Sequence, residues 1–111
     1  MALEITATTD NGWQIIQVIG QVDSKTVGDL RDFLEGEVKG GAPVALELTG
    51  VPFMSSAGLR TLLTLYRQTQ SLGVSLALVG LRDEIADTMK VTGFYQYFTV
   101  YPTVSELPAP A

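Results

Sequence analysis

The sequence VPFMSSAGLR, residues 51–60, joins two segments whose apolar residues follow different periods. Residues 44–48 form a short apolar run, and in residues 59–72 the apolar side chains recur at the i, i+3, i+4 spacing of an amphipathic helix. Ser55 and Ser56 therefore fall where a strand feeds a helix. Because the first N–H groups of a helix lack intrahelical partners, this position suits an anion, and serine is also a preferred N-cap residue. The two serines are either a cap or a functional site.

The segment after this helix predicts a parallel sheet. Gly73 ends the helix, and residues 74–79 form a near-continuous apolar run of the kind found in strands covered on both faces. A strand, a helix and a second strand in this order form a βαβ unit with parallel strands and a right-handed crossover. In the helix we expect five buried residues, Leu59, Leu62, Leu63, Tyr66 and Leu72, and five outward-facing ones, Arg60, Thr64, Arg67, Gln68 and Ser71.

Two β-rich runs precede this unit, at residues 3–8 and 13–19. They are separated by Asp10-Asn11-Gly12, and Asn-Gly is the favoured pair for a type I′ turn because both residues tolerate positive φ. The chain is therefore predicted to begin with an antiparallel hairpin.

A helix over residues 24–38 is predicted next, capped by Asp23 or Ser24. Its apolar positions recur at helical spacing and include Val27, Leu30 and Val38, with Phe33 or Leu34 between them. The opposite face carries four acidic residues, Asp29, Asp32, Glu35 and Glu37. This face is either a solvated surface or a docking face for a basic partner.

The last part of the chain predicts a third helix over residues 82–92, which begins with acidic residues and ends at Gly93. A short strand at residues 99–101 then completes the sheet, and residues 103–107 form a last helical turn. The aromatic cluster at 94–101 lacks interleaved basic residues, so we interpret it as packing and not as a platform for nucleic-acid bases.

The composition argues against several classes of function. A formal net charge of −5, with seven scattered basic residues, disfavours nucleic-acid binding. The chain has no cysteine and no histidine, which excludes a Ser-His-Asp triad, a cysteine nucleophile and metal sites built on thiolate or imidazole. We therefore expect a binding protein that is not an enzyme and needs no cofactor or metal.

The distribution of apolar residues predicts no contact with a membrane. No segment reaches the roughly 18–20 apolar residues needed to cross a bilayer, and the N-terminus lacks a signal peptide. We expect a cytoplasmic protein with one domain over residues 1–107. The ending Pro-Ala-Pro-Ala, residues 108–111, is predicted to be a disordered tail.

Glu47 is the exception in the apolar run. An unpaired carboxylate in a central strand is costly, so we expect Glu47 near the exposed end of the strand or paired with a cation such as Arg60. The alternative is a carboxylate that lines the serine site with Asp23 and helps to place the metal of a phosphate donor.

Four motifs together resemble the STAS domain of the anti-sigma factor antagonist family. The family's phosphorylation loop resembles residues 53–59, FMSSAGL. The strand that leads into that loop resembles residues 44–51, VALELTGV. GQVD at 20–23 is similar to the family's Gly-x-aliphatic-Asp turn, and VTGF at 91–94 to the end of its third helix. The resemblance covers about residues 3–107. Ser55 stands where the family commonly has Asp.

The resemblance implies an α/β fold, a single STAS (SpoIIAA-like) domain with helices packed against a mixed β-sheet. STAS antagonists bind an anti-sigma factor that is itself a serine kinase of the histidine-kinase-like ATPase fold, and this releases the sigma factor. Phosphorylation of the loop serine reverses the release, and a phosphatase is a further candidate partner. Matched onto this chain, the phosphoacceptor is Ser56. The expected partner-binding residues are Ser55, Ser56, Ala57, Gly58, Arg60, Thr64 and Asp23.

Two other functions stay open at this point. One is a STAS subunit of a transporter, such as the soluble component of a bacterial lipid-trafficking ABC complex, in which the same loop contacts an ATPase subunit constitutively. The other is a nucleotide hydrolase or kinase that uses Ser56. The absence of histidine and of a P-loop makes this enzyme the weakest of the three.

Overall fold

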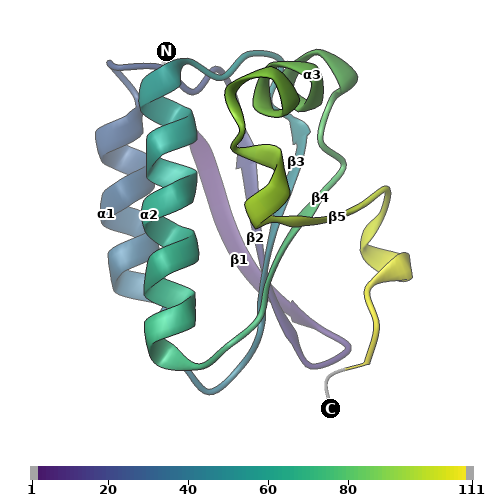
Figure 1. Ribbon diagram of the computed structural model, residues 1–111. Coiled ribbons are helices and arrows are strands. Elements are labelled where there is room, and N and C mark those ends of the chain that lie inside the picture. The colour runs from purple at the N-terminus through teal and green to yellow at the C-terminus, as the bar shows by residue number, and fades with distance from the viewer. Residues whose placement is uncertain (1–2, 110–111) are drawn as a thin grey trace.

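The computed structural model describes residues 3–109 of the chain (Figure 1). One five-stranded mixed sheet has the strand order β1-β2-β3-β4-β5, and the helices pack against it, which confirms the predicted fold class. The elements are β1 (Glu4–Asp10), β2 (Trp13–Ile19), α1 (Val27–Glu37), β3 (Val44–Gly50), α2 (Ser56–Leu72), β4 (Leu76–Val79), α3 (Asp83–Thr92), the 3-10 helix η1 (Tyr95–Tyr97), β5 (Thr99–Tyr101) and the 3-10 helix η2 (Val104–Glu106).

The predicted hairpin is present. β1 pairs antiparallel with β2, and Asp10 lies opposite Trp13 at its closed end. Asn11 and Gly12 both have positive φ, 51° and 83°, as a type I′ turn requires.

The remaining strand pairs are all parallel. β2 pairs with β3, β3 with β4, and β4 with β5, so the predicted β3–α2–β4 unit is confirmed. Because parallel strands end at the same edge of a sheet, the connections that follow β2, β3 and β4 meet at one edge. These connections lead into α1, α2 and α3.

One face of the sheet carries the main core. Alternate residues of the strands, among them Ile16, Val18, Leu46 and Leu78, point toward the three helices. Figure 1 shows α1 and α2 side by side along the sheet, with α3 near the end at which β3 finishes. The predicted apolar stripe of α1 is confirmed, because its residues Val27, Leu30 and Leu34 and the following Val38 are buried.

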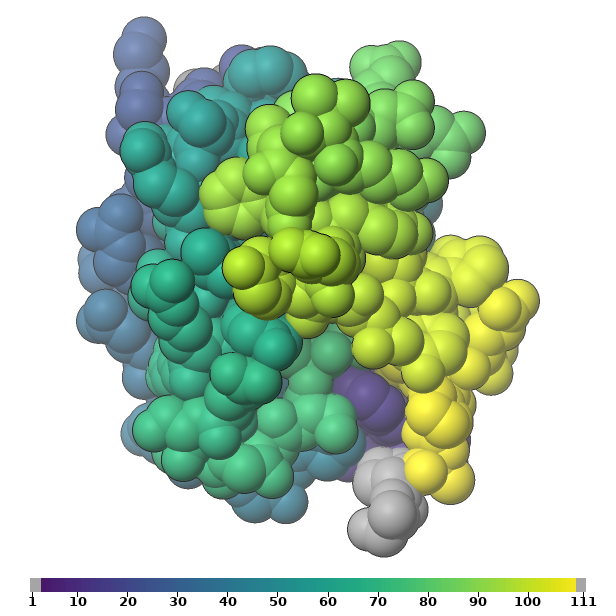
Figure 2. All heavy atoms as spheres, viewed as in Figure 1, coloured from purple at the N-terminus to yellow at the C-terminus, as the bar shows by residue number. Residues whose placement is uncertain are grey.

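The opposite face of the sheet is covered by the end of the chain. Trp13, Ile15, Ala45, Ala77 and Val79 form a second core with Leu107. The indole Nε1 of Trp13 donates a 2.7 Å hydrogen bond to the carbonyl oxygen of Pro108. In Figure 2 the yellow C-terminal segment lies against the body of the molecule.

The predicted disordered tail began at Pro108, and the structure describes its first two residues. The Pro108 carbonyl is held by Trp13. Residues 110 and 111 lie outside the described residues, so the tail stays a prediction there.

The predicted stripe of α2 was partly wrong. Leu59 and Leu62 are buried, but Leu63 and Tyr66 are only half-buried, and Leu72 is 41% exposed. In their place Leu65, Thr61 and Thr69 are buried. Both threonine hydroxyls donate to carbonyl oxygens of the same helix, those of Ala57 and Tyr66, so their burial leaves no polar group unpaired.

The third helix follows the prediction closely. α3 begins at Asp83, buries Ile85 and Met89, and ends at Gly93, which has the left-handed φ of 83° expected of a C-cap glycine. The aromatic cluster after it packs as expected. The ring centroid of Tyr66 lies 5.5 Å from the ring centroid of Tyr97 and 5.8 Å from that of Phe98.

Candidate functional site

The connections before α1 and α2 are bonded to each other beyond the ends of their strands. Val22 and Met54 form an isolated parallel bridge. The Val22 N–H donates to the Phe53 carbonyl oxygen at 3.0 Å, and the Ser55 N–H donates to the Val22 carbonyl oxygen at 2.8 Å. The neighbours of these residues in the chain, Asp23 and Ser56, are thereby brought to the same edge of the sheet.

Ser55 is the N-cap of α2. Its backbone is extended, with φ −77° and ψ 174°, and its side-chain oxygen accepts a 3.4 Å hydrogen bond from the Gly58 N–H. The Ser55 carbonyl accepts the first helical bond, from Leu59, at 3.0 Å. The cap interpretation is therefore correct for Ser55, and its hydroxyl has a structural role.

Ser56 is the first residue of α2, and it is exposed. Because Ser55 supplies the capping oxygen, the Ser56 hydroxyl is available for other chemistry. A group attached there lies beside the free N–H groups of the first helical turn, where negative charge is stabilised by roughly 0.3–1 kcal/mol. Ala57, which follows it, is half-buried against the main core.

Gly58 allows the start of α2 to approach the neighbouring connection. A Cβ atom at this position would lie 2.6 Å from Met54 Cγ and 2.8 Å from Val22 Cγ1. Both distances are shorter than van der Waals contact, so only glycine fits without displacement. Gly58 therefore shapes the site through packing and does not offer a side chain to a partner.

Asp23 stabilises the turn before α1. Its Oδ1 accepts hydrogen bonds from the backbone N–H groups of Lys25, at 2.9 Å, and Thr26, at 3.2 Å, while Gln21 Nε2 donates to Oδ2 at 3.3 Å. The Lys25 N–H lowers the pKa of Asp23 most; burial opposes the shift, and the bonds from Thr26 and Gln21 add to it.

The predicted start of α1 was wrong. The helix begins at Val27 and not at residue 24, and its N-cap is Thr26. Asp23 and Ser24 do not cap it, because Asp23 uses its carboxylate on the turn that comes first.

Arg60 and Thr64 are exposed on α2, one turn apart, as predicted. The Thr64 hydroxyl donates to the Arg60 carbonyl oxygen at 3.1 Å, so it is already paired within the helix. Arg60 lies in the first turns of α2, close in sequence to Ser56, and its side chain is exposed.

Glu47 is only half-buried and lies opposite Val79, the last residue of β4, which agrees with the predicted position near the exposed end of the strand, but the predicted pair with Arg60 and the predicted site beside Asp23 were wrong. Glu47 alternates with Leu46 and Leu48, so it lies on the face of the sheet opposite the helix that carries Arg60. Its carboxylate accepts hydrogen bonds from the backbone N–H and the hydroxyl of Thr49. It therefore neither pairs with Arg60 nor joins Asp23 beside the serines.

Two side chains near the site were not recognised in the sequence. Phe53 is 48% exposed although it is aromatic, and it lies in the connection that is bonded to Val22. Arg82 lies in the connection after β4, and its Nε and Nη2 donate to the Thr49 carbonyl oxygen at 3.1 and 3.0 Å. Of the two, only Phe53 could have been found from the sequence, because this aromatic residue stands between proline and methionine just before the predicted helix.

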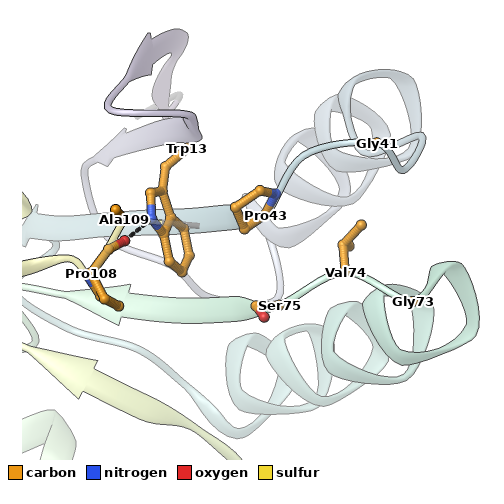
Figure 3. Close-up of a pocket in the computed structure, with 8 residues that line it drawn as sticks. All are labelled: Trp13, Gly41, Pro43, Gly73, Val74, Ser75, Pro108 and Ala109. Atoms are coloured by element: carbon orange, nitrogen blue, oxygen red, sulfur yellow. Dashed lines mark hydrogen bonds between the residues drawn. The ribbon is translucent and has the colours of Figure 1, made fainter. Parts of the chain in front are cut away.

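Two hollows of the described surface lie at opposite ends of the sheet, and only one of them is near the site. One, of about 300 Å³, is lined by Gln21, Asp23, Lys25 and Thr26 and so lies at the same edge of the sheet as Ser56. The other, of about 310 Å³, lies at the opposite end of the sheet, where Trp13, Pro43 and Ser75 meet (Figure 3). Within residues 3–109, no three His, Cys, Asp or Glu side chains are grouped as a metal site would require.

The chain belongs to the STAS domain family, whose model matches residues 4–107. It is similar to the anti-sigma-B factor antagonist of Listeria monocytogenes, with 30% identity over 79 residues that cover 70% of this chain and 69% of that protein. In the part of the chain that the structure describes, no helix is both long and apolar enough to span a membrane.

Solved structures share the fold at lower identity. An anti-sigma factor antagonist from Mycobacterium paratuberculosis has a TM-score of 0.83 at 23% identity, over 94% of this chain and 89% of that one. The antagonist SpoIIAA has a TM-score of 0.74 in its unphosphorylated form, at 14% identity over 94% of this chain and 90% of that one. Phosphorylated SpoIIAA from Bacillus has a TM-score of 0.69, at 16% identity over 94% of both chains.

Proposed function

We propose that this chain is an anti-sigma factor antagonist whose binding is switched off by phosphorylation of Ser56. In its unphosphorylated form it binds an anti-sigma factor that is also a serine kinase of the histidine-kinase-like ATPase fold, and the sigma factor is released. The family and the Listeria relative support the antagonist role. The kinase, and a phosphatase that reverses the modification, are the proposed partners in the cytoplasm.

The observation that carries the proposal is the division of roles between the two serines. The Ser55 oxygen is engaged by the Gly58 N–H, whereas Ser56 is exposed at the first position of α2. Of the two hydroxyls in this loop, a kinase therefore meets that of Ser56 as the more exposed one. Serine in place of the family's usual Asp keeps the capping function, because both residue types cap helices well.

Phosphorylation changes charge and leaves the fold in place. A phosphoserine carries about −1.5 to −2 charges at neutral pH, enough to oppose docking onto a surface that had accepted a neutral hydroxyl. The exposed position and the free N–H groups of the helix accommodate the added group. SpoIIAA has been solved in both forms, and each resembles this chain, which is consistent with a switch that does not refold the domain.

This role requires no catalysis by the chain itself. With no histidine and no cysteine in the sequence, Ser56 has no conventional base to activate it as a nucleophile. We therefore assign Ser56 as the substrate of a partner kinase and not as a catalytic residue.

The test compares two substitutions of Ser56 for binding to the kinase purified from the native cytosol by its activity on this protein. Ser56→Asp places a charge in the interface, so we expect at least a tenfold loss of affinity. Ser56→Ala removes a hydroxyl whose net contribution is about 1 kcal/mol, so it binds nearly as well as the wild type and cannot be switched off. Phosphopeptide mapping is expected to place the phosphate on Ser56.

Thermal unfolding of both variants controls for folding, since Asp is also tolerated in the first helical turn. If Ser56→Asp binds as tightly as the wild type at matched stability, the switch is wrong. Constitutive binding to a transporter ATPase, the alternative drawn from the sequence, is then the better explanation.

A further inference from the structure

The segments that follow β2, β3 and β4 each carry one exposed basic side chain close to the edge of the sheet where Ser56 lies. We define the recognition edge as residues 20–26, 51–60 and 80–86, which follow β2, β3 and β4 and include the starts of α2 and α3. Its basic residues are Lys25, Arg60 and Arg82, all exposed. Since β2, β3 and β4 are neighbours in the sheet, the three connections are neighbours too.

The recognition edge differs in charge from the rest of the molecule. Its three basic residues are balanced by Asp23, Asp83 and Glu84, so the formal net charge of −5 is carried entirely by other residues. The Asp23 carboxylate is bound by N–H groups of its own turn, which compensates part of its charge. An approaching acidic surface therefore meets less repulsion at this edge than at the acidic face of α1.

Arg82 is already ordered for binding. Two of its N–H groups converge on the carbonyl oxygen of Thr49, which fixes the guanidinium plane against the end of β3. The remaining N–H groups of the guanidinium have no other hydrogen bond among the described residues and stay accessible to a ligand. A fixed guanidinium loses little side-chain entropy on binding and can hold a carboxylate with two parallel bonds.

We propose that Lys25, Arg60 and Arg82 bind an acidic surface of the partner, with Arg82 as the ordered anchor. This inference rests on the proposed function and names the chemistry of the partner's contact surface. It also explains why a phosphate on Ser56 prevents binding. The added negative charge lies among the three basic residues, cancels their attraction and meets the partner's carboxylates as a like charge.

The acidic face of α1 also favours binding of an acidic partner at the recognition edge. Asp29, Asp32, Glu35 and Glu37 are exposed there, so a partner with a basic surface is drawn to α1 and away from Ser56. A partner with an acidic surface is repelled by α1 and directed to the recognition edge. A charge placed on Ser56 therefore controls the binding of a partner with an acidic surface and not that of a partner with a basic surface.

The test reverses each basic charge and measures association with the serine kinase that modifies Ser56, at low and at physiological salt. We expect Arg82→Glu to weaken binding about tenfold, and Lys25→Glu and Arg60→Glu about threefold each, mainly through slower association. Higher salt reduces the difference from the wild type. The matched control is Arg67→Glu, an exposed arginine on α2 outside the recognition edge, which stays within about twofold of wild type apart from the general effect of net charge.

The sign of the effect decides the inference. Tighter binding by the Glu variants shows a basic partner surface and overturns it, and so does affinity equal to that of Arg67→Glu. If Arg82→Glu does not fold, because Thr49 loses its partner, Lys25→Glu and Arg60→Glu give the decision.

The same variants separate this inference from the proposed function. When the Glu variants bind normally and Ser56→Asp does not, the phosphorylation switch stands and only this inference fails. When Ser56→Asp also binds normally, the proposed function fails first.

Discussion

A Cβ atom on Gly58 would lie 2.8 Å from Cγ1 of Val22, so the start of α2 touches the segment that leads into α1. The same two segments are joined by the bond from the Ser55 N–H to the Val22 carbonyl oxygen. The position of Ser56 on the surface therefore depends on a contact between residues far apart in the chain.

Gly58→Ala is expected to destabilise the protein by about 1–3 kcal/mol. The added methyl group overlaps Met54 Cγ, at 2.6 Å, and Val22 Cγ1, and a filled core responds to such overlap by shifts of backbone and side chains. Urea unfolding measures the loss. Because the overlap displaces the loop, the rate of Ser56 phosphorylation by the kinase is also expected to fall.

The control is Gly28→Ala in the first turn of α1. Nothing lies within 4 Å of a Cβ atom there, and the residue is exposed. Alanine favours a helix interior over glycine by about 0.5–1 kcal/mol, and part of this preference acts in the first turn, so this variant is expected to be at least as stable as the wild type. Equal effects at the two glycines would mean that the contact of Gly58 with Val22 has no energetic weight.

The two serines are expected to differ in their effect on stability. Ser55→Ala removes the capping oxygen that Gly58 N–H uses, at an expected cost of about 1 kcal/mol. Ser56→Ala changes an exposed hydroxyl and is expected to stay within about 0.5 kcal/mol of the wild type. Chemical denaturation of both variants measures the difference. A larger loss at Ser56 than at Ser55 would reverse the roles assigned here.

The sequence predicted those features that depend on neighbouring residues. Asn11-Gly12 predicted the hairpin, and Gly73 and Gly93 predicted the ends of two helices, because each needs a positive φ that glycine or asparagine provides. The position of the serine loop between a strand and a helix was also predicted correctly. It depends on a cap, a glycine and a following apolar stripe, which are all local signals.

Features that depend on the choice of packing partner were not predictable in this way. α2 has apolar residues on more than one side, so its period alone could not favour Leu65 over Leu63 as the buried residue. Glu47 was assigned a distant cation although Thr49, two residues away, supplies its hydrogen bonds. Likewise the bridge between Val22 and Met54 joins residues that no sequence pattern connects.

Leu107→Ala is expected to cost about 2–3 kcal/mol of stability and to loosen the end of the chain. Leu107 is 5% exposed and closes the second core over Trp13. Trp13 is the single tryptophan and is 4% exposed, so its fluorescence reports this region directly. We expect emission at longer wavelength in the variant, because water reaches the indole.

Val91→Ala serves as the control for this core. Val91 is 88% exposed at the end of α3, so its truncation is expected to change stability by less than about 0.5 kcal/mol and to leave Trp13 emission unchanged. If Leu107→Ala unfolds at the same urea concentration as Val91→Ala, the C-terminal segment does not contribute to the folded core.

Asp23 is expected to make stability depend on pH in the acid range. Hydrogen bonds, above all the one from the Lys25 N–H, lower the pKa of Asp23 in the folded state, so the ionised carboxylate stabilises the fold. This stabilisation is fully present above the unfolded-state pKa of about 3.9 and is lost as the pH falls through the lower folded-state pKa. Asp23→Asn is therefore expected to be less stable than the wild type at pH 6, and the difference is expected to shrink below pH 4. Urea unfolding across this pH range measures the difference. The control for the loss of one negative charge is Asp32→Asn, on the exposed face of α1. A difference that stays constant down to the lowest pH, or that matches Asp32→Asn throughout, would show that the turn before α1 does not depend on the ionised carboxylate.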